Sequence, residues 1–452
     1  MAGRKCTRAL KNNMGRHTST PSEELPPGYK MTELGPLPEG WEVARLGETA
    51  DLIMGQSPPS STYNTEMKGL PFLQGKADFG DIHPNPTKWC SQPLKIAKPN
   101  DVLVSVRAPV GDVNLADKEY CIGRGLASIR VRTKLVDAHF IYYYLIFSKE
   151  KLQAKGAGST FQSINKDILQ RFPVPLPPLP EQQAIAEILR AVQRAKEATE
   201  RVIAALRELK KSLMRHLFTH GPVPVDQADR VALRETELGS LPEGWEVARL
   251  GDLFEIQQGK ALSPKARAGA RKRPFLRTAN VLWGRIDLSA LDEMHFEKEE
   301  EKRLALIPGD LLVCEGGDVG RTALWEGQLP LMLYQNHLHR LRAARADIAP
   351  LFYMYWMQAA WTLFDIYGGT GNRTTIPNLS KSRLAALLAP LPPLPEQQAI
   401  AEILRAVDCK IEAEEARQRA LEALFRTLLH DLMTARLRLP QAFITRFAED
   451  AP

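Results

Sequence analysis

Two blocks of sequence occur twice in this chain, in the same order. PLPPLPEQQAIAEILRAV runs from Pro175 to Val192 and again from Pro390 to Val407. TELGPLPEGWEVARLG begins at Thr32, and the same letters with one substitution begin at Thr236. Two long matches in the same order do not arise by chance, so the chain consists of two copies of one unit. Any fold that the chain adopts must therefore contain the same structural plan twice.

The segments between the blocks, residues 48–174 and 252–389, show little identity with each other. They share short echoes, such as PFLQ at 71–74 and PFLR at 274–277. Both carry β-rich alternation with Gly and Pro at the turns, and both carry one apolar helical stretch. We expect strands within 101–113, 126–133, 310–320 and 337–343, and helices within 140–152 and 351–367. The sequence therefore predicts a mixed α/β (α+β) fold in each copy.

A long helix is expected after the proline-rich block in each copy. Proline lacks an N–H group and restricts the residue before it, so we expect the first helix to begin at Pro180. Apolar residues then recur at alternating steps of three and four, which is typical of a coiled-coil seam. The expected seam consists of Ile185, Ile188, Val192, Ala195, Thr199, Val202, Leu206, Leu209 and Leu213. In the second helix Lys410, Glu414 and Arg417 occupy the matching positions, so we expect a weak or shifted contact there.

Each apolar stripe could pack onto its own domain, but two stripes of equal length in one chain favour mutual pairing. The chain returns between the two helices, so we expect an antiparallel coiled coil with pseudo-two-fold symmetry. Such a pair would be a stiffer spacer between two domains than a flexible linker.

Composition excludes several classes of protein. The chain has 452 residues, 44% of them hydrophobic and 25% charged, with a net charge of +7, which is typical of a globular protein of several domains. Five cysteines lie far apart without a C-x-x-C pair, so neither a zinc finger nor a disulfide framework is supported. Neither a membrane span nor a signal peptide is apparent, so we expect a cytoplasmic protein without a membrane partner. The positive charge permits nucleic acid as a partner without demonstrating it.

No complete catalytic set is visible in the sequence. It lacks a GxxxxGK[ST] phosphate loop, an HExxH zinc motif and the polar-Pro-Pro-aromatic tetrapeptide of adenine methyltransferases. Glu300 and Lys302 have the spacing of a nuclease motif, but they lie in the charge run EKEEEK (297–302), which we interpret as a solvated face. His337 and His339 fit a surface or DNA-facing pair on a strand better than a metal site. We therefore expect neither catalysis nor a metal site in this chain.

Polar residues in the variable segments remain as candidates for function. Arg, Lys, Asn, Gln and hydroxyl side chains read base edges and bind phosphates. GAGSTFQSINK (156–166) and GGTGNRTTIPN (368–378) combine such residues with glycine turns, each just before the proline-rich block. Either segment alone could be a solvent loop, but the matched placement favours DNA binding. The candidate DNA-binding residues are Gln74, Lys76, Arg107, Arg124, Ser159, Thr160, Gln162, Asn165 and Lys166 in the first copy and Arg277, Asn280, Arg285, Arg321, Asn372, Arg373 and Thr374 in the second.

The repeated LPEGWEVARLG and PLPPLPEQQAIAEIL resemble the repeats of the specificity subunits of type I restriction-modification systems. The alternation of a variable domain with a long helix, twice, is also similar to that family. The resemblance covers about residues 32–437 and implies two target-recognition domains and two spacer helices. The expected boundaries are a mobile basic extension at 1–31, target-recognition domain 1 at 32–174, hinge and helix at 175–218, a linker at 219–235, target-recognition domain 2 at 236–389, hinge and helix at 390–437, and a tail at 438–452.

The resemblance also implies a function. Each target-recognition domain would read one half of a split, asymmetric site in double-stranded DNA, and the helix pair would set the gap between the halves. Two copies of a separate methyltransferase subunit would bring S-adenosylmethionine, and restriction subunits would bring ATP and Mg. The chain itself would hold no cofactor and would have no activity alone.

Two alternatives stay open at this point. The chain could be a coiled-coil scaffold that binds only protein, in which case DNA affinity with a steep dependence on salt would be missing. It could also be the specificity subunit of another restriction type, which the sequence alone does not distinguish.

Overall fold

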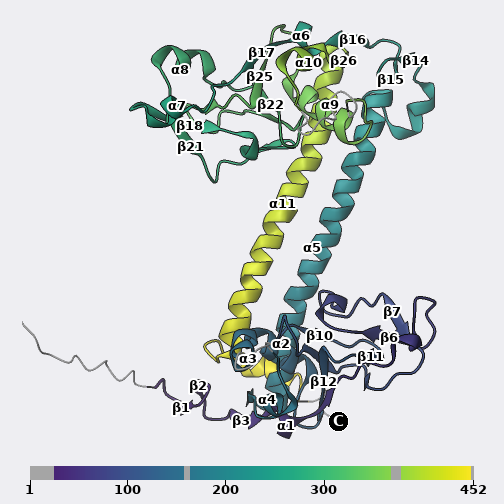
Figure 1. Ribbon diagram of the computed structural model, residues 1–452, viewed down its shortest axis with the longest axis vertical. Helices are drawn as coiled ribbons and strands as arrows, with labels where there is room; N and C mark the ends of the chain where they lie inside the picture. The colour runs from purple at the N-terminus through teal and green to yellow at the C-terminus, as the bar shows by residue number, and fades with distance from the viewer. Residues whose placement is uncertain (1–24, 157–162, 368–377, 449–452) are drawn as a thin grey trace, which may run out of the picture. The chain divides into compact units, whose positions relative to one another are not determined.

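The computed structural model describes residues 25–156, 163–367 and 378–448. The chain forms two compact units: unit 1 combines the chain up to Lys196 with residues from Ala420 onward, and unit 2 runs from Glu197 to Arg419. Each unit contains one variable domain and a part of each long helix (Figure 1). The units therefore divide within the long helices, whereas the sequence repeats divide the chain between the first long helix and the second variable domain.

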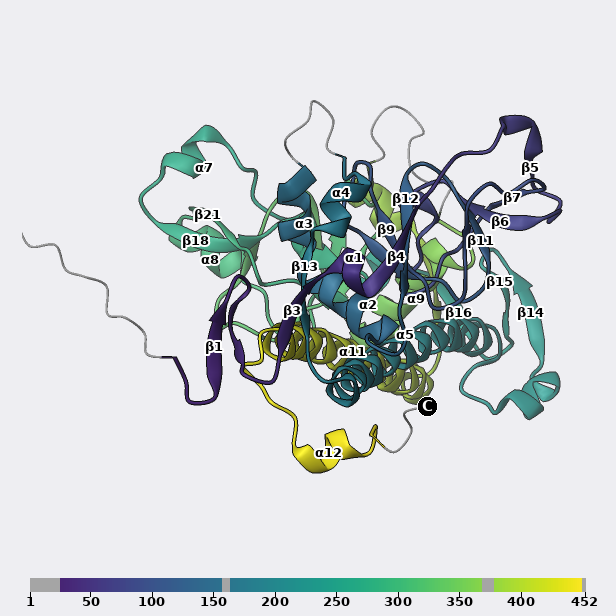
Figure 2. The ribbon, with the colours of Figure 1, turned by 90° about the horizontal axis from the view of Figure 1, so that it is seen from below.

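The variable domain of unit 1 is built on two sheets. The antiparallel sheet has the order β10-β9-β12-β4, and the second sheet has the order β5-β7-β6-β11-β8, with β6 and β11 parallel. Figure 2 shows β9, β12 and β4 beside helix α2 (Ala138–Phe147). The strands are β4 (Ala50–Met54), β5 (Tyr63–Asn64), β6 (Leu70–Leu73), β7 (Lys88–Cys90), β8 (Ile96–Ala97), β9 (Val102–Ser105), β10 (Val113–Leu115), β11 (Tyr120–Ile122) and β12 (Leu126–Val131).

Unit 2 repeats this topology although its sequence differs. The order β17-β25-β22-β23 matches β4-β12-β9-β10, and β18 pairs with β24 in parallel as β6 does with β11. The faint sequence echoes therefore mark a common framework. The strands are β17 (Phe254–Gln258), β18 (Lys272–Leu276), β19 (Val281–Leu282), β20 (Arg285–Ile286), β21 (Asp292–His295), β22 (Leu311–Cys314), β23 (Thr322–Leu324), β24 (Leu333–Tyr334) and β25 (Leu338–Ala343).

One helix of each domain is buried on nearly all sides, as expected from its apolar sequence. Helix α2 belongs to the core of unit 1, and α9 (Pro350–Thr362) belongs to the core of unit 2. The stretch 140–152 is divided, because α2 ends at Phe147 and α3 (Lys149–Gly156) begins after Ser148. The other short helices are α1 (Leu46–Thr49), α4 (Lys166–Gln170), α6 (Leu250–Leu253), α7 (Pro264–Ala268), α8 (Lys298–Leu304), α10 (Lys381–Ala386) and α12 (Gln441–Thr445), and the 3-10 turns are η1 (Ser60–Thr62), η2 (Lys76–Asp78), η3 (Val225–Arg230) and η4 (Thr278–Asn280).

The duplicated blocks fold in the same way in both units. A hairpin precedes a strand that pairs with the first part of the proline-rich block: β3 (Glu42–Arg45) with β13 (Pro173–Leu176), and β16 (Glu246–Arg249) with β26 (Leu388–Leu391). The hairpins are β1 (Tyr29–Thr32) with β2 (Gly35–Pro38) and β14 (Leu233–Thr236) with β15 (Gly239–Pro242). Strand β1 begins at Tyr29, within the stretch 1–31 that was predicted to be a mobile extension, and the predicted tail 438–452 contains α12.

The long helices are α5 (Leu179–His220) and α11 (Leu394–Met433), close to the predicted ranges. In unit 2 their side chains meet in antiparallel order, because Gln418 contacts Glu200 at 3.0 Å, whereas Lys210 contacts Asp408 at 2.7 Å. In unit 1 the Lys196 ammonium group lies 5.7 Å from the ring centre of Phe425. The predicted antiparallel pairing is confirmed within each unit (Figure 1).

The seam predicted for α5 is only half correct. The expected positions Ile185, Val192, Thr199, Leu206 and Leu213 are correct. The other expected positions were Ile188, Ala195, Val202 and Leu209. In the structure their place in the seam is taken by the row Leu189, Lys196, Ile203, Lys210 and Leu217. Val202 and Leu209 are 42% and 47% exposed, whereas Ile203 is 5% exposed. Alternating steps of three and four allow either row to complete the seam. The structure selects the row that contains two lysines.

The seam of α11 shifts as its sequence suggested. Lys410 and Arg417 point to solvent and form ion pairs with Glu414 at 2.9 and 3.7 Å. Ile411 is buried in place of Lys410, and Glu414 is buried at its expected seam position. The seam therefore shifts by one residue at Lys410, and the helix is not interrupted.

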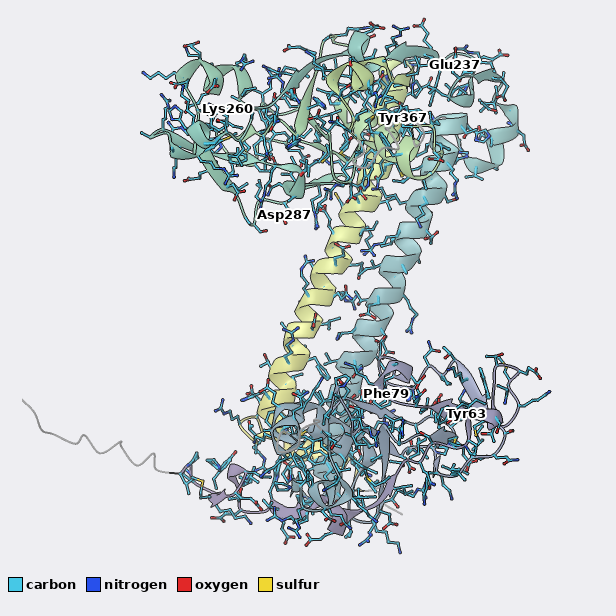
Figure 3. The ribbon with its side chains drawn as sticks, viewed as in Figure 1. Tyr63, Phe79, Glu237, Lys260, Asp287 and Tyr367 are labelled. Atoms are coloured by element: carbon cyan, nitrogen blue, oxygen red, sulfur yellow. The ribbon has the colours of Figure 1, made fainter. Side chains whose placement is uncertain are left out.

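The charge run 297–302 is not a solvated face throughout. Glu301 forms ion pairs with Arg271 at 2.6 Å and Arg273 at 2.7 Å, and Glu300 pairs with Lys260, which Figure 3 labels. Burial alone would raise the pKa of Glu301, but hydrogen bonds from the two arginines outweigh it and hold the pKa below its ordinary value. Glu300 and Glu301 therefore form ion pairs within unit 2.

Candidate nucleic-acid interface

In unit 1, several strands end at one edge of the domain and bring predicted residues together. Gly123 N–H donates to Leu73 O at 2.7 Å, so Arg124 lies beside the end of β6, where Gln74 follows. Val106 N–H donates to Gly125 O at 2.9 Å, which places Arg107 next to the same turn. We call the residues at these strand ends, 74–76, 106–107, 123–125 and 163–166, edge 1.

Most predicted residues of edge 1 are exposed. Gln74, Lys76, Arg107, Arg124, Asn165 and Lys166 all reach solvent. Asn165 also has a structural task, because its Oδ1 accepts a hydrogen bond from Ile168 N–H at 2.9 Å and caps α4. Arg107 pairs with Ser163 across an isolated β-bridge. Edge 1 therefore offers cations and amides on a rigid frame of backbone hydrogen bonds.

Unit 2 has the same edge, built by the same hydrogen bonds. Gln335 N–H donates to Leu276 O at 2.8 Å, and Glu315 N–H donates to His337 O at 2.9 Å. We call residues 277, 315–317, 335–337 and 378–381 edge 2. The turn beneath each edge needs a glycine, because Gly111 and Gly320 both have φ of +84° and donate to Ser105 O and Cys314 O.

The side chains on the two edges differ. Edge 1 carries Arg107 and Arg124, whereas edge 2 carries Glu315, Asn336 and His337. Glu315 is 8% exposed; its Oε2 accepts from Gln258 Nε2 at 3.0 Å and lies 3.8 Å from His337 Nδ1. The two edges therefore have the same backbone frame and different side chains.

Of the predicted residues in unit 2, Arg277 lies on edge 2 and pairs with Asp292 at 3.0 Å. Asn280 is 4% exposed, and its amide group donates to Asp287 O and Ala290 O while accepting from Arg277 N–H. Its prediction as a DNA contact is corrected, because a buried amide with these partners has nothing left to offer a base.

Arg321 also has a structural role. Its guanidinium donates to Thr278 O at 3.1 Å and pairs with Asp318 at 3.3 Å, and its side chain is 16% exposed. These contacts tie the turn after β22 to η4. Its assignment to DNA stays a prediction.

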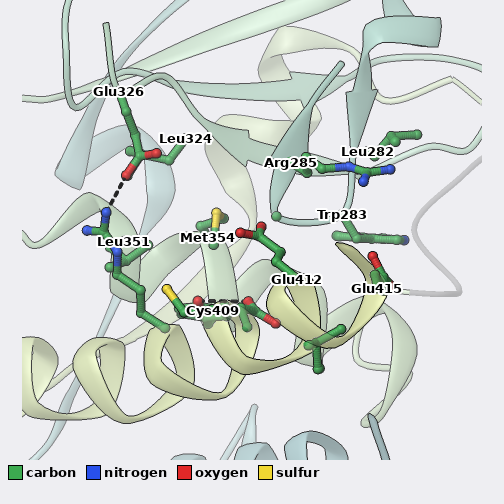
Figure 4. A pocket seen from close by; sticks show the side chains of 15 residues that line it. Leu282, Trp283, Arg285, Leu324, Glu326, Leu351, Met354, Cys409, Glu412 and Glu415 are labelled. Atoms are coloured by element: carbon green, nitrogen blue, oxygen red, sulfur yellow. Dashed lines mark hydrogen bonds and ion pairs between the residues drawn. The ribbon is translucent and has the colours of Figure 1, made fainter. Parts of the chain in front are cut away.

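Arg285 lies away from edge 2, on the hairpin of β19 and β20. Figure 4 shows the cavity of about 280 Å³ that it lines together with Trp283 and, from α11, Glu412 and Glu415. Arg285 is exposed and lies outside edge 2, so its assignment to DNA stays a prediction.

Six predicted residues, Ser159, Thr160, Gln162, Asn372, Arg373 and Thr374, lie outside the described residues. The residues that follow these segments are placed equivalently: Ile164 N–H donates to Val106 O, and Leu379 N–H donates to Glu315 O, both at 2.9 Å. The matched placement noted in the sequence thus holds for the flanks of both segments.

Sequence reasoning missed Lys88, which lies beside edge 1, Gln258, which lies beside edge 2, and Glu315 and Asn336 on edge 2. Lys88 stands opposite Phe72 in the pairing of β7 with β6. Gln258 ends β17, whose counterpart β4 ends without a polar amide. A polar residue directly at the end of a predicted strand was the available signal, but it becomes informative only when the strand order is known.

His339 was expected on the surface and is buried. Its Nε2 lies 2.9 Å from Leu379 O, which can only accept, so Nε2 carries the proton. Its Nδ1 has no partner among the described residues. Burial lowers the pKa of His339, so the ring is neutral near pH 7. It supports the strand that leads into edge 2.

Within the described ranges, no group of three or more His, Cys, Asp or Glu side chains is arranged to hold a metal ion. In the same ranges, no helix has the length and apolar character needed to cross a membrane.

Two segments of the chain, residues 38–208 and 242–423, match the family described as the type I restriction modification DNA specificity domain. The chain belongs to this family. It is a specificity subunit of the type I restriction-modification class, whose members are non-catalytic. The matched segments contain both edges described above.

Named relatives agree with this assignment. The putative type I restriction enzyme MjaX specificity subunit of Methanocaldococcus jannaschii is 48% identical over 193 residues, which are 42% of this chain and 45% of that relative. The chain thus spans less than half of that relative in the match. The MjaVIII specificity subunit of the same organism is 26% identical over 417 residues, 89% of this chain and 94% of the relative.

Solved structures show the fold. The crystal structure of the type I restriction-modification S subunit from M. genitalium has a TM-score of 0.59 at 20% identity, covering 87% of this chain and 96% of that one. A chain from a study of complex assembly and conformational transition of the type I restriction-modification system has a TM-score of 0.53 at 19% identity, covering 89% and 99%.

Proposed function

We propose that this specificity subunit reads a bipartite, asymmetric site in double-stranded DNA, one half with each target-recognition domain. The observation that carries the proposal is the pair of edges with one backbone frame and different side chains. Strand ends held by backbone hydrogen bonds keep side chains in fixed positions, which reading of base edges requires. Arginine and asparagine are suited to bidentate contacts with guanine and adenine.

The antiparallel helices would set the gap between the two half-sites. A helix pair fixes a distance better than a flexible linker does, because it retains little conformational freedom. Lengthening or shortening both helices should therefore change the accepted gap and leave the letters of each half-site unchanged.

The partners of this subunit would be two methyltransferase subunits and the restriction subunits, in the cytoplasm. S-adenosylmethionine would belong to the methyltransferase, and ATP and Mg to the restriction subunits; this chain would contribute no cofactor. Support comes from the apolar row of α5 that the seam leaves exposed in unit 2, Val202 and Leu209. An exposed row at helical spacing suits a helix of a partner protein.

Mapping of methylated adenines tests the proposal. Genomic DNA is compared between cells that carry this gene with its methyltransferase and restriction genes and cells that lack this gene alone. We expect one split motif with unequal halves in the first cells and none in the second. An unmethylated genome, or a motif that persists without this gene, would reject the proposal; binding of the same complex to protein but not to DNA would instead indicate a scaffold.

A further inference from the structure

The end of β6 in unit 1 opens onto a cavity of about 430 Å³. Its lining includes Gln74 and Lys76 from one side, Thr87 and Lys88 from the neighbouring strand, and Pro109 from the loop after β9. Lys88 is exposed and forms no ion pair with any described residue. Two ammonium groups thus border one cavity at edge 1.

Lys76 is held in place by a carboxylate. Its Nζ lies 3.0 Å from Asp112 Oδ2, and Lys149 Nζ lies 2.5 Å from Asp112 Oδ1. The side chain of Asp112 is 17% exposed, whereas those of Lys76 and Lys149 are 46% and 39% exposed. The side chain of Asp112 is thus more deeply buried than those of the two lysines that it pairs with. Two lysines that share one carboxylate keep a net positive charge and lose freedom of movement.

The titration of Asp112 agrees with this geometry. Burial alone would raise the pKa of Asp112, but the hydrogen bonds and charges of Lys149 and Lys76 outweigh it and lower the pKa. The carboxylate therefore stays ionised at neutral pH and continues to hold both lysines.

We propose that this cavity is a phosphate subsite for the DNA backbone, in which Lys76 and Lys88 bind one phosphate and Asp112 is a positioning residue for Lys76. The inference rests on the proposed function. It adds that some residues at edge 1 bind phosphate while others contact bases. Phosphate contacts fix the register of a protein on the duplex, and base contacts supply the sequence information. Gln74 and Arg124, next to the subsite, then face the bases in a fixed register.

The direction in which a neutral substitution of Asp112 changes DNA affinity distinguishes a positioning role from a simple effect of net charge. Removing a negative charge near phosphates strengthens DNA binding if only the net charge matters. If Asp112 instead positions Lys76, the neutral variant Asp112→Asn weakens binding, because the released lysine must be ordered again at each binding event.

The experiment measures binding of the complete complex with its methyltransferase to a duplex that carries the methylated site, over a series of salt concentrations. Lys76→Gln combined with Lys88→Gln should reduce the slope of log K against log salt by about 0.9, the value for one lost phosphate contact, and each single variant should reduce it by less, with the methylated motif unchanged. The matched control is Lys68→Gln. Lys68 precedes β6 at the opposite end of the strand and pairs with Glu66, so its loss should leave the slope unchanged.

Asp112→Asn should lower the affinity several-fold while its thermal unfolding stays close to the wild type. If that variant fails to fold, Lys149→Gln replaces it: Asp112 then neutralises Lys76 alone, and the slope should again fall. Unchanged slopes for Lys76→Gln and Lys88→Gln, or tighter binding by Asp112→Asn, would overturn the subsite. Failure of the wild-type complex to bind the duplex at all would instead reject the proposed function.

Discussion

The indole Nε1 of Trp41 donates a hydrogen bond to Glu181 Oε2 at 3.0 Å, across 140 residues of sequence. Trp245 and Glu396 form the same bond in unit 2 at 2.8 Å. Trp41 belongs to one duplicated block and Glu181 to the other. The bond therefore explains why the two blocks are repeated together: each pair ties a long helix to the start of its domain.

Removal of Glu181 should destabilise unit 1. Glu181 is 4% exposed and also accepts from Arg438 Nε at 3.1 Å, so Glu181→Ala leaves a buried indole N–H and a guanidinium without their acceptor. We expect a loss of about 1–3 kcal/mol in the free energy of unfolding, measured by chemical denaturation. Glu181→Gln keeps an acceptor and should lose less. Glu187→Ala, which removes an exposed partner of Arg194 on the same helix, should change the stability by under about 1 kcal/mol.

Gln397 should be far more sensitive to substitution than its neighbour Gln398. Gln397 is fully buried; its Oε1 accepts from Ala349 N–H at 2.8 Å, and its Nε2 donates to Asp347 O and Pro392 O. Gln397→Ala leaves these three backbone groups unpaired and should cost at least about 2 kcal/mol. Gln398→Ala, at an exposed position, serves as the matched control in the same denaturation assay. Equal losses for the two variants would contradict this account of the EQQ sequence.

The plan of the fold could be predicted because the sequence patterns that indicate it extend over many residues. A duplication of whole blocks and an apolar period over four heptads leave few alternatives. The exact seam could not be predicted, because Lys196 and Lys210 made the correct row look polar. Their stems pack in the interface while their ammonium groups lie over the rings of Phe425 and Tyr355, at 5.7 and 5.1 Å.

The candidate site could be predicted only in part, for a different reason. Arg107 and Arg124 are 17 positions apart and lie at the same edge only because Val106 N–H bonds to Gly125 O, where the pairing of β9 with β12 ends. Asn280 has the residue type of a base reader, yet burial assigns it to a turn. Residue type states what a side chain is able to bind, whereas strand order decides whether it reaches a ligand.

Substitutions on the two edges should act on separate half-sites. Arg124→Ala on edge 1 should relax reading of one half, and Asn336→Ala on edge 2 should relax reading of the other, each by about 1–3 kcal/mol of discrimination. Methylation mapping of each variant measures the effect as a loss of preference at specific letters of the motif. Arg132→Ala, which removes an exposed arginine paired with Asp51 away from edge 1, should leave both halves intact. Relaxation of both halves by one substitution would contradict the division between the edges.

The exposed row of α5 should be required for a partner and dispensable for the fold. Val202→Asp combined with Leu209→Asp places two charges on residues that are 42% and 47% exposed, so the melting temperature of the chain should change little. Co-purification with the methyltransferase subunit should be lost, because two desolvated carboxylates would oppose docking of an apolar helix. Val225→Asp is the control, since Val225 is 73% exposed but lies on η3. Normal co-purification of the double variant would exclude this row as the docking site.

Acid should destabilise unit 2 through His339. In the folded chain burial lowers the pKa of His339, whereas in the unfolded chain the ring titrates near its ordinary value of about 6.5. Below that value the unfolded state binds more protons than the folded state, so stability decreases as pH falls, by at most about 1.4 kcal/mol per pH unit for one group.

A proton added to folded His339 would have to sit on Nδ1, which has no acceptor among the described residues. His339→Asn can still donate to Leu379 O and does not titrate, so its free energy of unfolding should decline less between pH 7 and pH 5.5 than that of the wild type. Identical declines for the two proteins, measured by urea denaturation in the same buffers, would mean that His339 is protonated equally in both states.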